Sequence, residues 1–186
     1  MLYVILALAS LFLIVIAMML LGKVPAKSTG ALAGIIGVTG SILILYMVAT
    51  DALSAFGPTA SFAGGIGAFV FFMIYILIAF EVAGGTDFKA TGWFALIGGT
   101  LVLLIGLGWG LGGGLKFGDA LPAVAQFGWM FVVWAIAFYL IFLIFGLGMT
   151  KLTKLLAWYL IIPTTIITVV WPIIMFVNRG VIGEWW

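Results

Sequence analysis

The sequence predicts an all-α membrane protein with six transmembrane helices, and two observations lead to this fold class. First, 67% of the 186 residues are hydrophobic, only 6% are charged, and the mean hydropathy is +1.46, whereas a soluble domain carries about 25% charged residues. Second, the chain contains six apolar stretches close to the roughly 20 residues that a spanning helix needs. These stretches lie at 2–21, 31–50, 62–80, 92–111, 123–145 and 155–178. We therefore expect a single membrane domain over residues 1–186, with the lipid bilayer as its solvent.

A repeated pattern divides this domain into three parts. When the sequence is shifted against itself by 62 residues, the spacing G-x4-K-x-T-x3-A occurs three times, each time between two predicted spans. The aligned residues are Gly22, Gly84 and Gly146; Lys27, Lys89 and Lys151; Thr29, Thr91 and Thr153; and Ala33, Ala95 and Ala157. This pattern predicts three two-helix hairpins, at approximately 1–62, 63–124 and 125–186, arranged around a pseudo-threefold axis. A competing interpretation is that membrane turns resemble one another by necessity.

The stretch GKVPAKSTGALAGIIG at 22–37 illustrates what such a turn requires. We expect its hydroxyl groups to cap the start of the returning helix by accepting hydrogen bonds from free backbone N–H groups. We expect its glycines to let two helices approach closely.

Basic residues predict the orientation in the membrane. The loops after the first, third and fifth spans hold Lys23, Lys27, Lys89, Lys151 and Lys154, whereas the opposite side holds only Lys116 and Arg179. Basic loops favour the cytoplasm. We therefore expect a multi-pass plasma (inner) membrane protein with both termini on the outer side.

The residue inventory excludes several functional classes. The chain has no cysteine and no histidine, so thiolate chemistry, zinc clusters and histidine-based acid–base catalysis are not available. No nucleophile–base pair or metal-binding pattern is present, so we expect neither an enzyme nor a cofactor. The net charge of +2 is too small for a nucleic-acid footprint. No ionisable residue lies in the middle of a predicted span, which permits a pathway for a small neutral solute and argues against ions.

Aromatic and hydroxyl side chains are the candidates for lining such a pathway. Trp134 and Phe138 are four residues apart and lie on one helix face, and Tyr75 offers both a ring and a hydroxyl. Flat aromatic walls suit a flat solute, although simple packing would explain these residues equally well. The hydroxyls of Thr164, Thr165 and Thr168 in the last span are candidates for replacing hydrogen bonds that a solute loses to water.

Several stretches resemble a known family. GKVPAKST, FMIYILIAFE at 72–81, GWFALIGGT at 92–100 and WAIAFYLIFLIFGLG at 134–148 are similar to segments of the urea and short-chain-amide channels of the AmiS/UreI type. The resemblance covers most of the chain. It implies hexamers in which each protomer has its own pore, narrowed by Tyr75, Trp134 and Phe138, with Phe138 standing where the family has a second tryptophan. It also implies a glutamate in the last span, where this chain has Pro163 or Thr164.

The expected function is therefore a passive channel for urea, short-chain amides or a similar small neutral solute. Because the chain has no histidine, we expect no gating by external acid. Two alternatives remain open. One is a non-transporting structural subunit of a larger membrane complex. The other is a six-helix acetate transporter, for which the sequence offers neither an ionisable residue at mid-span nor an Asn-Pro motif.

Overall fold

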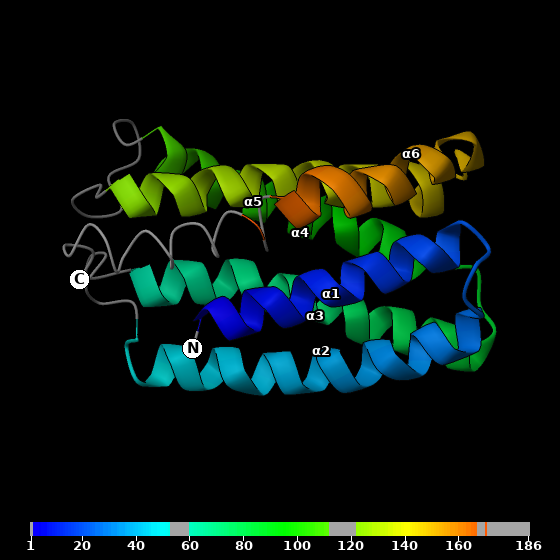
Figure 1. The fold of residues 1–186 in the computed structure, drawn as a ribbon, viewed down its shortest axis with the longest axis horizontal. Coiled ribbons are helices and arrows are strands. Elements are labelled where there is room, and N and C mark those ends of the chain that lie inside the picture. The colour runs from blue at the N-terminus through cyan, green and yellow to red at the C-terminus, as the bar shows by residue number, and fades with distance from the viewer. Residues whose placement is uncertain (1, 53–59, 112–121, 167–169, 171–186) are drawn as a thin grey trace.

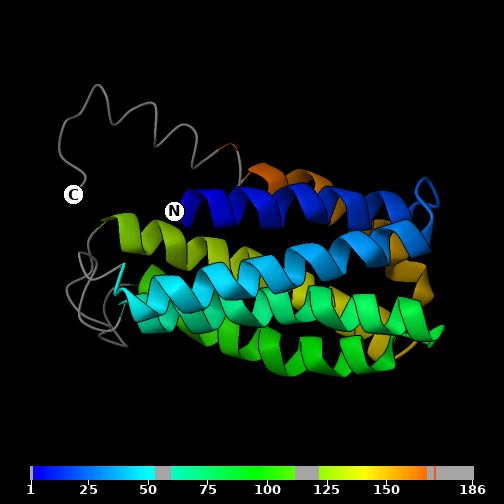
Figure 2. The same cartoon turned by 90° about the horizontal axis from the view of Figure 1, so that it is seen from below.

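The computed structural model describes residues 2–52, 60–111, 122–166 and 170, and these form an all-helical bundle. The helices lie side by side with their long axes roughly aligned (Figures 1 and 2). They are α1 (Leu2–Leu20), α2 (Ala26–Ala49), α3 (Ala60–Gly84), α4 (Lys89–Gly110), α5 (Pro122–Ile141) and α6 (Thr153–Tyr159). Each of the six predicted spans thus contains a helix.

Two of the helices continue as π-helical turns. Segment η2 (Phe142–Gly146) extends α5, and η4 (Leu160–Thr164) extends α6; the short 3-10 turn η3 (Thr150–Leu152) lies between them. Pro163 lies inside η4. Because proline has no backbone N–H, it cannot make the usual α-helical hydrogen bond, and the regular helix is interrupted here. The part of the predicted last span beyond Ile166 lies, apart from Val170, outside the described residues.

Within the described residues, four helical segments are long and apolar enough to cross a membrane. They are Ala26–Ala49, Ser61–Gly84, Lys89–Gly110 and Gly128–Gly146, and Ala9–Leu20 forms a shorter apolar helix. A bilayer core of about 30 Å requires helices of about this length. The segments correspond to four of the six predicted spans.

Glycines set the closest helix contacts. A Cβ atom built on Gly37 of α2 would lie 2.7 Å from a side-chain carbon of Ile76 in α3. Likewise, a Cβ on Gly106 of α4 would lie 2.8 Å from the carbonyl oxygen of Gly128 in α5. Only glycine permits backbones to approach this closely, as small residues do in membrane helix packing generally. The predicted use of glycine for close packing in the stretch 22–37 is confirmed at Gly37.

The turns between α1 and α2, between α3 and α4, and between η2 and α6 lie at one end of the bundle, opposite the start of α1 (Figure 1). Each turn contains one glycine with positive φ: Gly22 at 71°, Gly85 at 65° and Gly148 at 73°. The shift of 62 residues aligns Gly22 with Gly84 and Gly146 instead. The geometric counterparts are therefore displaced by one residue in the second turn and by two residues in the third.

The predicted hydroxyl caps are wrong. Helix α2 begins after Pro25 and α4 begins after Phe88, and neither N-cap residue makes a side-chain capping hydrogen bond. Because α2 starts five residues before the predicted span, Thr29 lies within its first turns, and the hydroxyl donates to the carbonyl oxygen of Pro25 at 3.2 Å. Backbone geometry set by Pro25 starts the helix here, and the threonine acts as a donor.

Candidate functional site

A cluster of aromatic rings occupies the centre of the bundle. Tyr75 from α3 and Trp134 and Phe138 from α5 are each 1% exposed, and Phe71 of α3 joins them. The Phe71 ring stacks on Trp134 with centroids 4.5 Å apart, and it meets Phe138 and Tyr75 edge-on at 5.4 and 5.3 Å. The structure therefore brings the three predicted constriction residues together around a fourth ring. Sequence reasoning missed Phe71, although its position four residues before Tyr75 on the same helix was a usable signal.

A hydrogen bond fixes the orientation of Tyr75. Its hydroxyl donates to the carbonyl oxygen of Ala9 in α1 at 2.9 Å. The Phe12 ring packs edge-on against the tyrosine ring with centroids 4.6 Å apart. Tyr75 therefore ties α3 to α1, and it presents its ring rather than its hydroxyl to the rest of the cluster.

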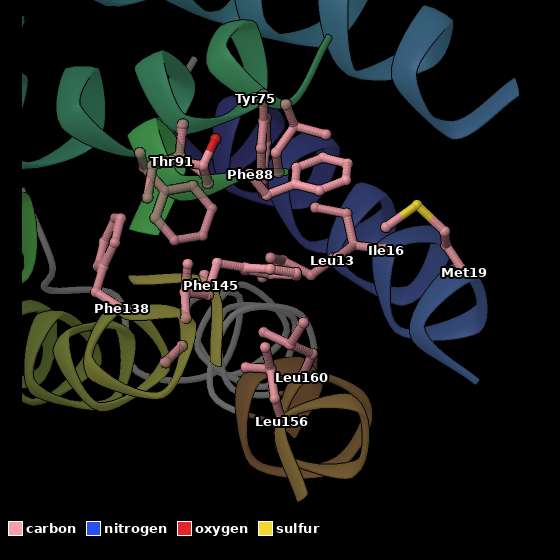
Figure 3. Close-up of a pocket in the computed structure, with 15 residues that line it drawn as sticks. Leu13, Ile16, Met19, Tyr75, Phe88, Thr91, Phe138, Phe145, Leu156 and Leu160 are labelled. Carbon is pink, nitrogen blue, oxygen red and sulfur yellow. The ribbon is translucent and has the colours of Figure 1, made fainter. Parts of the chain in front are cut away.

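A cavity lies beside this cluster (Figure 3), and its lining residues Met19, Phe88 and Phe145 place it toward the lysine-bearing turns. The centre of a water-sized sphere can occupy about 30 Å³ of it, and one water needs about 10–15 Å³ on this measure. The cavity therefore has room for about two water-sized molecules. Its lining includes Leu13, Ile16, Met19, Phe71, Ile74, Tyr75, Ile78, Phe88, Thr91, Ala137, Phe138, Ile141, Phe145, Leu156 and Leu160.

The cavity walls are apolar. The two hydroxyl-bearing residues on the lining, Tyr75 and Thr91, both direct their hydroxyls to protein acceptors. Both π-helical turns reach the cavity, through Phe145 of η2 and Leu160 of η4. Single π turns inside α-helices are frequent at functional sites.

A buried carboxyl group lies next to the cavity. Glu81, near the end of α3, is 8% exposed and accepts hydrogen bonds from the backbone N–H of Thr91 at 3.2 Å and from the Thr91 hydroxyl. The preceding helix thus supplies a capping acceptor for the first turn of α4, which its own side chains do not provide. Hydropathy places Glu81 at the end of a span, but the contact with Thr91 depends on how α3 and α4 pack.

The threonines predicted to line the pathway do not line the cavity where the structure describes them. The Thr164 hydroxyl donates to the carbonyl oxygen of Tyr159 at 3.0 Å, and the Thr165 hydroxyl donates to that of Leu160 at 3.5 Å. Neither residue belongs to the cavity lining. Thr168 lies outside the described residues. The role of these hydroxyls remains a prediction.

Two buried indole N–H groups have no hydrogen-bond acceptor in the described part of the chain. They belong to Trp134 and to Trp109 of α4. The Phe131 ring lies between the two indoles, 5.6 Å from Trp109 and 5.5 Å from Trp134. The described residues contain no group of three or more acidic, cysteine or histidine side chains able to hold a metal ion.

At the lysine-bearing end, the turn before α4 carries an exposed ion pair. Lys89 Nζ lies 2.9 Å from Asp87 Oδ2, and the Lys89 backbone N–H donates to Asp87 Oδ1. Hydrogen bonding from Lys89 lowers the pKa of Asp87 below its ordinary value. The carboxylate therefore stays charged throughout the neutral and mildly acidic range.

Apolar helices of spanning length, packed around an aromatic cluster and an apolar cavity, define a polytopic membrane protein with a small internal site. A family model described as "AmiS/UreI family transporter" matches residues 1–179. The chain therefore belongs to the AmiS/UreI family of transporters.

Relatives agree with this assignment. The curated protein named "Putative transporter protein AmiS2" from Rhodococcus erythropolis is 26% identical over 146 residues, which are 78% of this chain and 65% of that relative. The matched region thus spans less than two thirds of the relative's length. A cryo-EM structure of the Helicobacter pylori urea channel in a closed state shares the fold, with a TM-score of 0.78 and 19% identity over 96% of this chain and 99% of the other. A crystal structure of the H. pylori urea channel is also similar in fold. Its TM-score is 0.71 and its sequence identity 21%, again over 96% of this chain and 99% of the other.

Proposed function

We propose that the protein is a passive channel for urea, short-chain amides or a similar small neutral polar solute, with one pore in each protomer. The observation that carries this proposal is the ring cluster of Tyr75, Trp134 and Phe138, packed around Phe71 beside the central cavity. A solute entering the cavity from the far side would have to pass between these rings. They therefore form the constriction of the proposed pathway.

Aromatic walls explain the proposed selectivity. A flat amide or urea group can slide between flat rings while its polar edge reaches the few available hydrogen-bond partners. An ion would lose its hydration shell in apolar surroundings that offer no replacement ligands. The small volume of the cavity, about 30 Å³ for the centre of a water-sized sphere, favours solutes of a few heavy atoms.

The proposed architecture is three hairpins, at about 1–62, 63–124 and 125–186, around a pseudo-threefold axis. Glycines of α2 pack on α3 and glycines of α4 pack on α5, and α6 contacts α1, as a cyclic arrangement requires. The aligned alanines Ala33, Ala95 and Ala157 are all fully buried. We place both termini outside and, because of the resemblance to hexameric channels, expect six copies to assemble.

The test is solute entry into proteoliposomes, followed by stopped-flow light scattering with urea, acetamide, acetate and glycerol. Wild-type protein should accelerate urea or acetamide entry over empty liposomes, but not acetate entry. Trp134→Ala removes the ring stacked on Phe71 and should change the urea and acetamide rates severalfold. The exposed Trp158 offers a control, because Trp158→Ala should leave both rates unchanged.

The same assay separates the alternatives. Absence of entry above empty liposomes for every solute, with folded and oriented protein, would leave the structural subunit as the better account. Selective acetate entry would favour the acetate transporter. Because the chain has no histidine, the wild-type rate should be the same at about pH 5 as at about pH 7.5, a range in which histidine titrates.

A further inference from the structure

Two tryptophans near the constriction carry buried donors that the protein does not use. Trp109 is 5% exposed and Trp134 is 1% exposed, and within the described residues neither Nε1–H has an acceptor. A buried donor without a partner destabilises a protein by about 1–3 kcal/mol. Such groups are rare in native proteins, and each needs an explanation.

The two donors lie in succession along the bundle. Trp109 is the last residue but one of α4 and lies toward the end of the bundle opposite the lysine-bearing turns. Trp134 lies in the middle of α5. Phe131 connects them, with ring centroids 5.6 Å from Trp109 and 5.5 Å from Trp134. Trp134 in turn stacks on Phe71, which borders the cavity. A continuous series of rings therefore runs from the far end of α4 to the cavity.

Close packing of α4 on α5 holds this series in place. The backbones meet at Gly106 and Gly128, where a Cβ atom on Gly106 would lie 2.8 Å from the carbonyl oxygen of Gly128. This contact brings the last turn of α4 against Phe131. The Trp109 ring is thus positioned by backbone contacts rather than by a hydrogen bond of its own.

An indole N–H is a donor only, so it matches an acceptor on the ligand. We infer that Trp109 and Trp134 form a carbonyl-binding subsite on the outer approach to the constriction. Trp109 Nε1 receives the carbonyl oxygen of an amide or urea first, and Trp134 Nε1 receives it next. The inference deepens the proposed function and rests on it. It assigns solute selection to Trp109, which lies outside the predicted constriction of Tyr75, Trp134 and Phe138.

The subsite predicts a preference between solutes that differ in one atom. Sulfur is a weaker hydrogen-bond acceptor than oxygen, so thiourea and thioacetamide gain less from an indole donor than urea and acetamide do. A site that donates to an oxygen discriminates against analogues that bond poorly. The ratio of urea to thiourea permeability, each corrected for empty liposomes, should therefore depend on Trp109.

The first experiment compares wild-type protein with Trp109→Phe, which keeps an aromatic ring next to Phe131 and removes the N–H group. We expect urea and acetamide entry to slow by about three- to tenfold, which corresponds to one hydrogen bond. Thiourea and thioacetamide entry should change by less than about twofold, so the selectivity ratio falls. Trp93→Phe is the matched control, because Trp93 lies on the same helix, near its other end, and is exposed.

The second experiment detects binding without flux. In detergent-solubilised protein carrying ¹⁵N-labelled indoles, adding acetamide should shift the Trp109 and Trp134 Nε1–H resonances, assigned by their loss in the Trp→Phe variants. Unshifted resonances would overturn the subsite even if the protein conducts urea. An unchanged selectivity ratio in Trp109→Phe, or an equal loss for oxygen and sulfur solutes, would also overturn it. Shifted resonances without solute flux would support the subsite and count against the channel.

Discussion

At the scale of single residues, Thr91 and Thr29 occupy equivalent positions of the sequence repeat but make different contacts. Thr91 donates to the buried carboxyl group of Glu81 and links α4 to α3, whereas Thr29 donates to Pro25 in its own first turn. Both threonines are fully buried. They therefore allow the cross-helix bond to be tested against a local one.

We predict that Thr91→Val lowers the stability of the protein by about 1–3 kcal/mol, because it leaves a buried carboxyl oxygen without its hydroxyl partner. Thr29→Val has nearly the same size change but loses only a bond to its own turn, so it should cost less than about 1 kcal/mol. Unfolding in detergent, followed by circular dichroism, measures both. Equal losses in the two variants would contradict a special role for the Glu81–Thr91 contact.

Some residues of the candidate site could be predicted from the sequence and others could not. Helical spacing predicted that Trp134 and Phe138 share a face, and both are buried beside Tyr75. Spacing alone did not predict that Phe71 would join them, because a ring contact between α3 and α5 depends on how two helices distant in sequence pack. The unpaired N–H of Trp109 is likewise visible only in three dimensions.

At the scale of helices, glycine contacts between backbones determine how closely α4 and α5 approach. A Cβ atom on Gly106 would lie 2.8 Å from Gly128 O and 2.9 Å from the backbone nitrogen of Val132. Neither backbone atom can move aside without shifting α5. In contrast, a Cβ on Gly84, the last residue of α3, would meet nothing closer than 3.6 Å.

We predict that Gly106→Ala separates α4 from α5 and destabilises the protein by about 1–3 kcal/mol, as overpacking does. Gly84→Ala adds the same methyl group at an ordinary van der Waals distance of 3.6 Å from Thr86 and should change stability by less than about 0.5 kcal/mol. Thermal unfolding in detergent distinguishes the two variants. If Gly106→Ala matches Gly84→Ala, the backbone contact does not limit the approach of the helices.

Hydropathy predicted a helix in each expected span but not its local geometry. Helix α2 starts at Ala26 and not at residue 31, because lysine and serine are tolerated in the first turns of a helix at the membrane surface. The π turns Phe142–Gly146 and Leu160–Thr164 were not predicted. One extra residue in a turn leaves the apolar composition unchanged, and Pro163 was a local sign of an irregular helix at η4.

At the scale of the whole molecule, the three described turns gather at one end of the bundle (Figure 1). The 62-residue shift predicted equivalent turns, yet the positive-φ glycines are Gly22, Gly85 and Gly148. Small insertions at a turn leave the helix pattern intact, so a fixed shift locates the turns only to within two residues. The third turn, whose positive-φ glycine lies two residues after the aligned Gly146, directly follows the π-helical segment η2.

The positions of these turns lead to a prediction about orientation. The chain has no cysteine, so single cysteine variants can be labelled without background. Lys23→Cys and Lys151→Cys place an exposed thiol at the lysine-bearing end, and Thr50→Cys places one just beyond the opposite end of α2. Because basic loops favour the cytoplasm, an impermeant maleimide added to intact cells should label Thr50→Cys alone, and all three should be labelled once the membrane is opened. The reverse pattern would place both termini inside. Labelling of only one of the two lysine positions in intact cells would be incompatible with three hairpins whose turns share one side of the membrane.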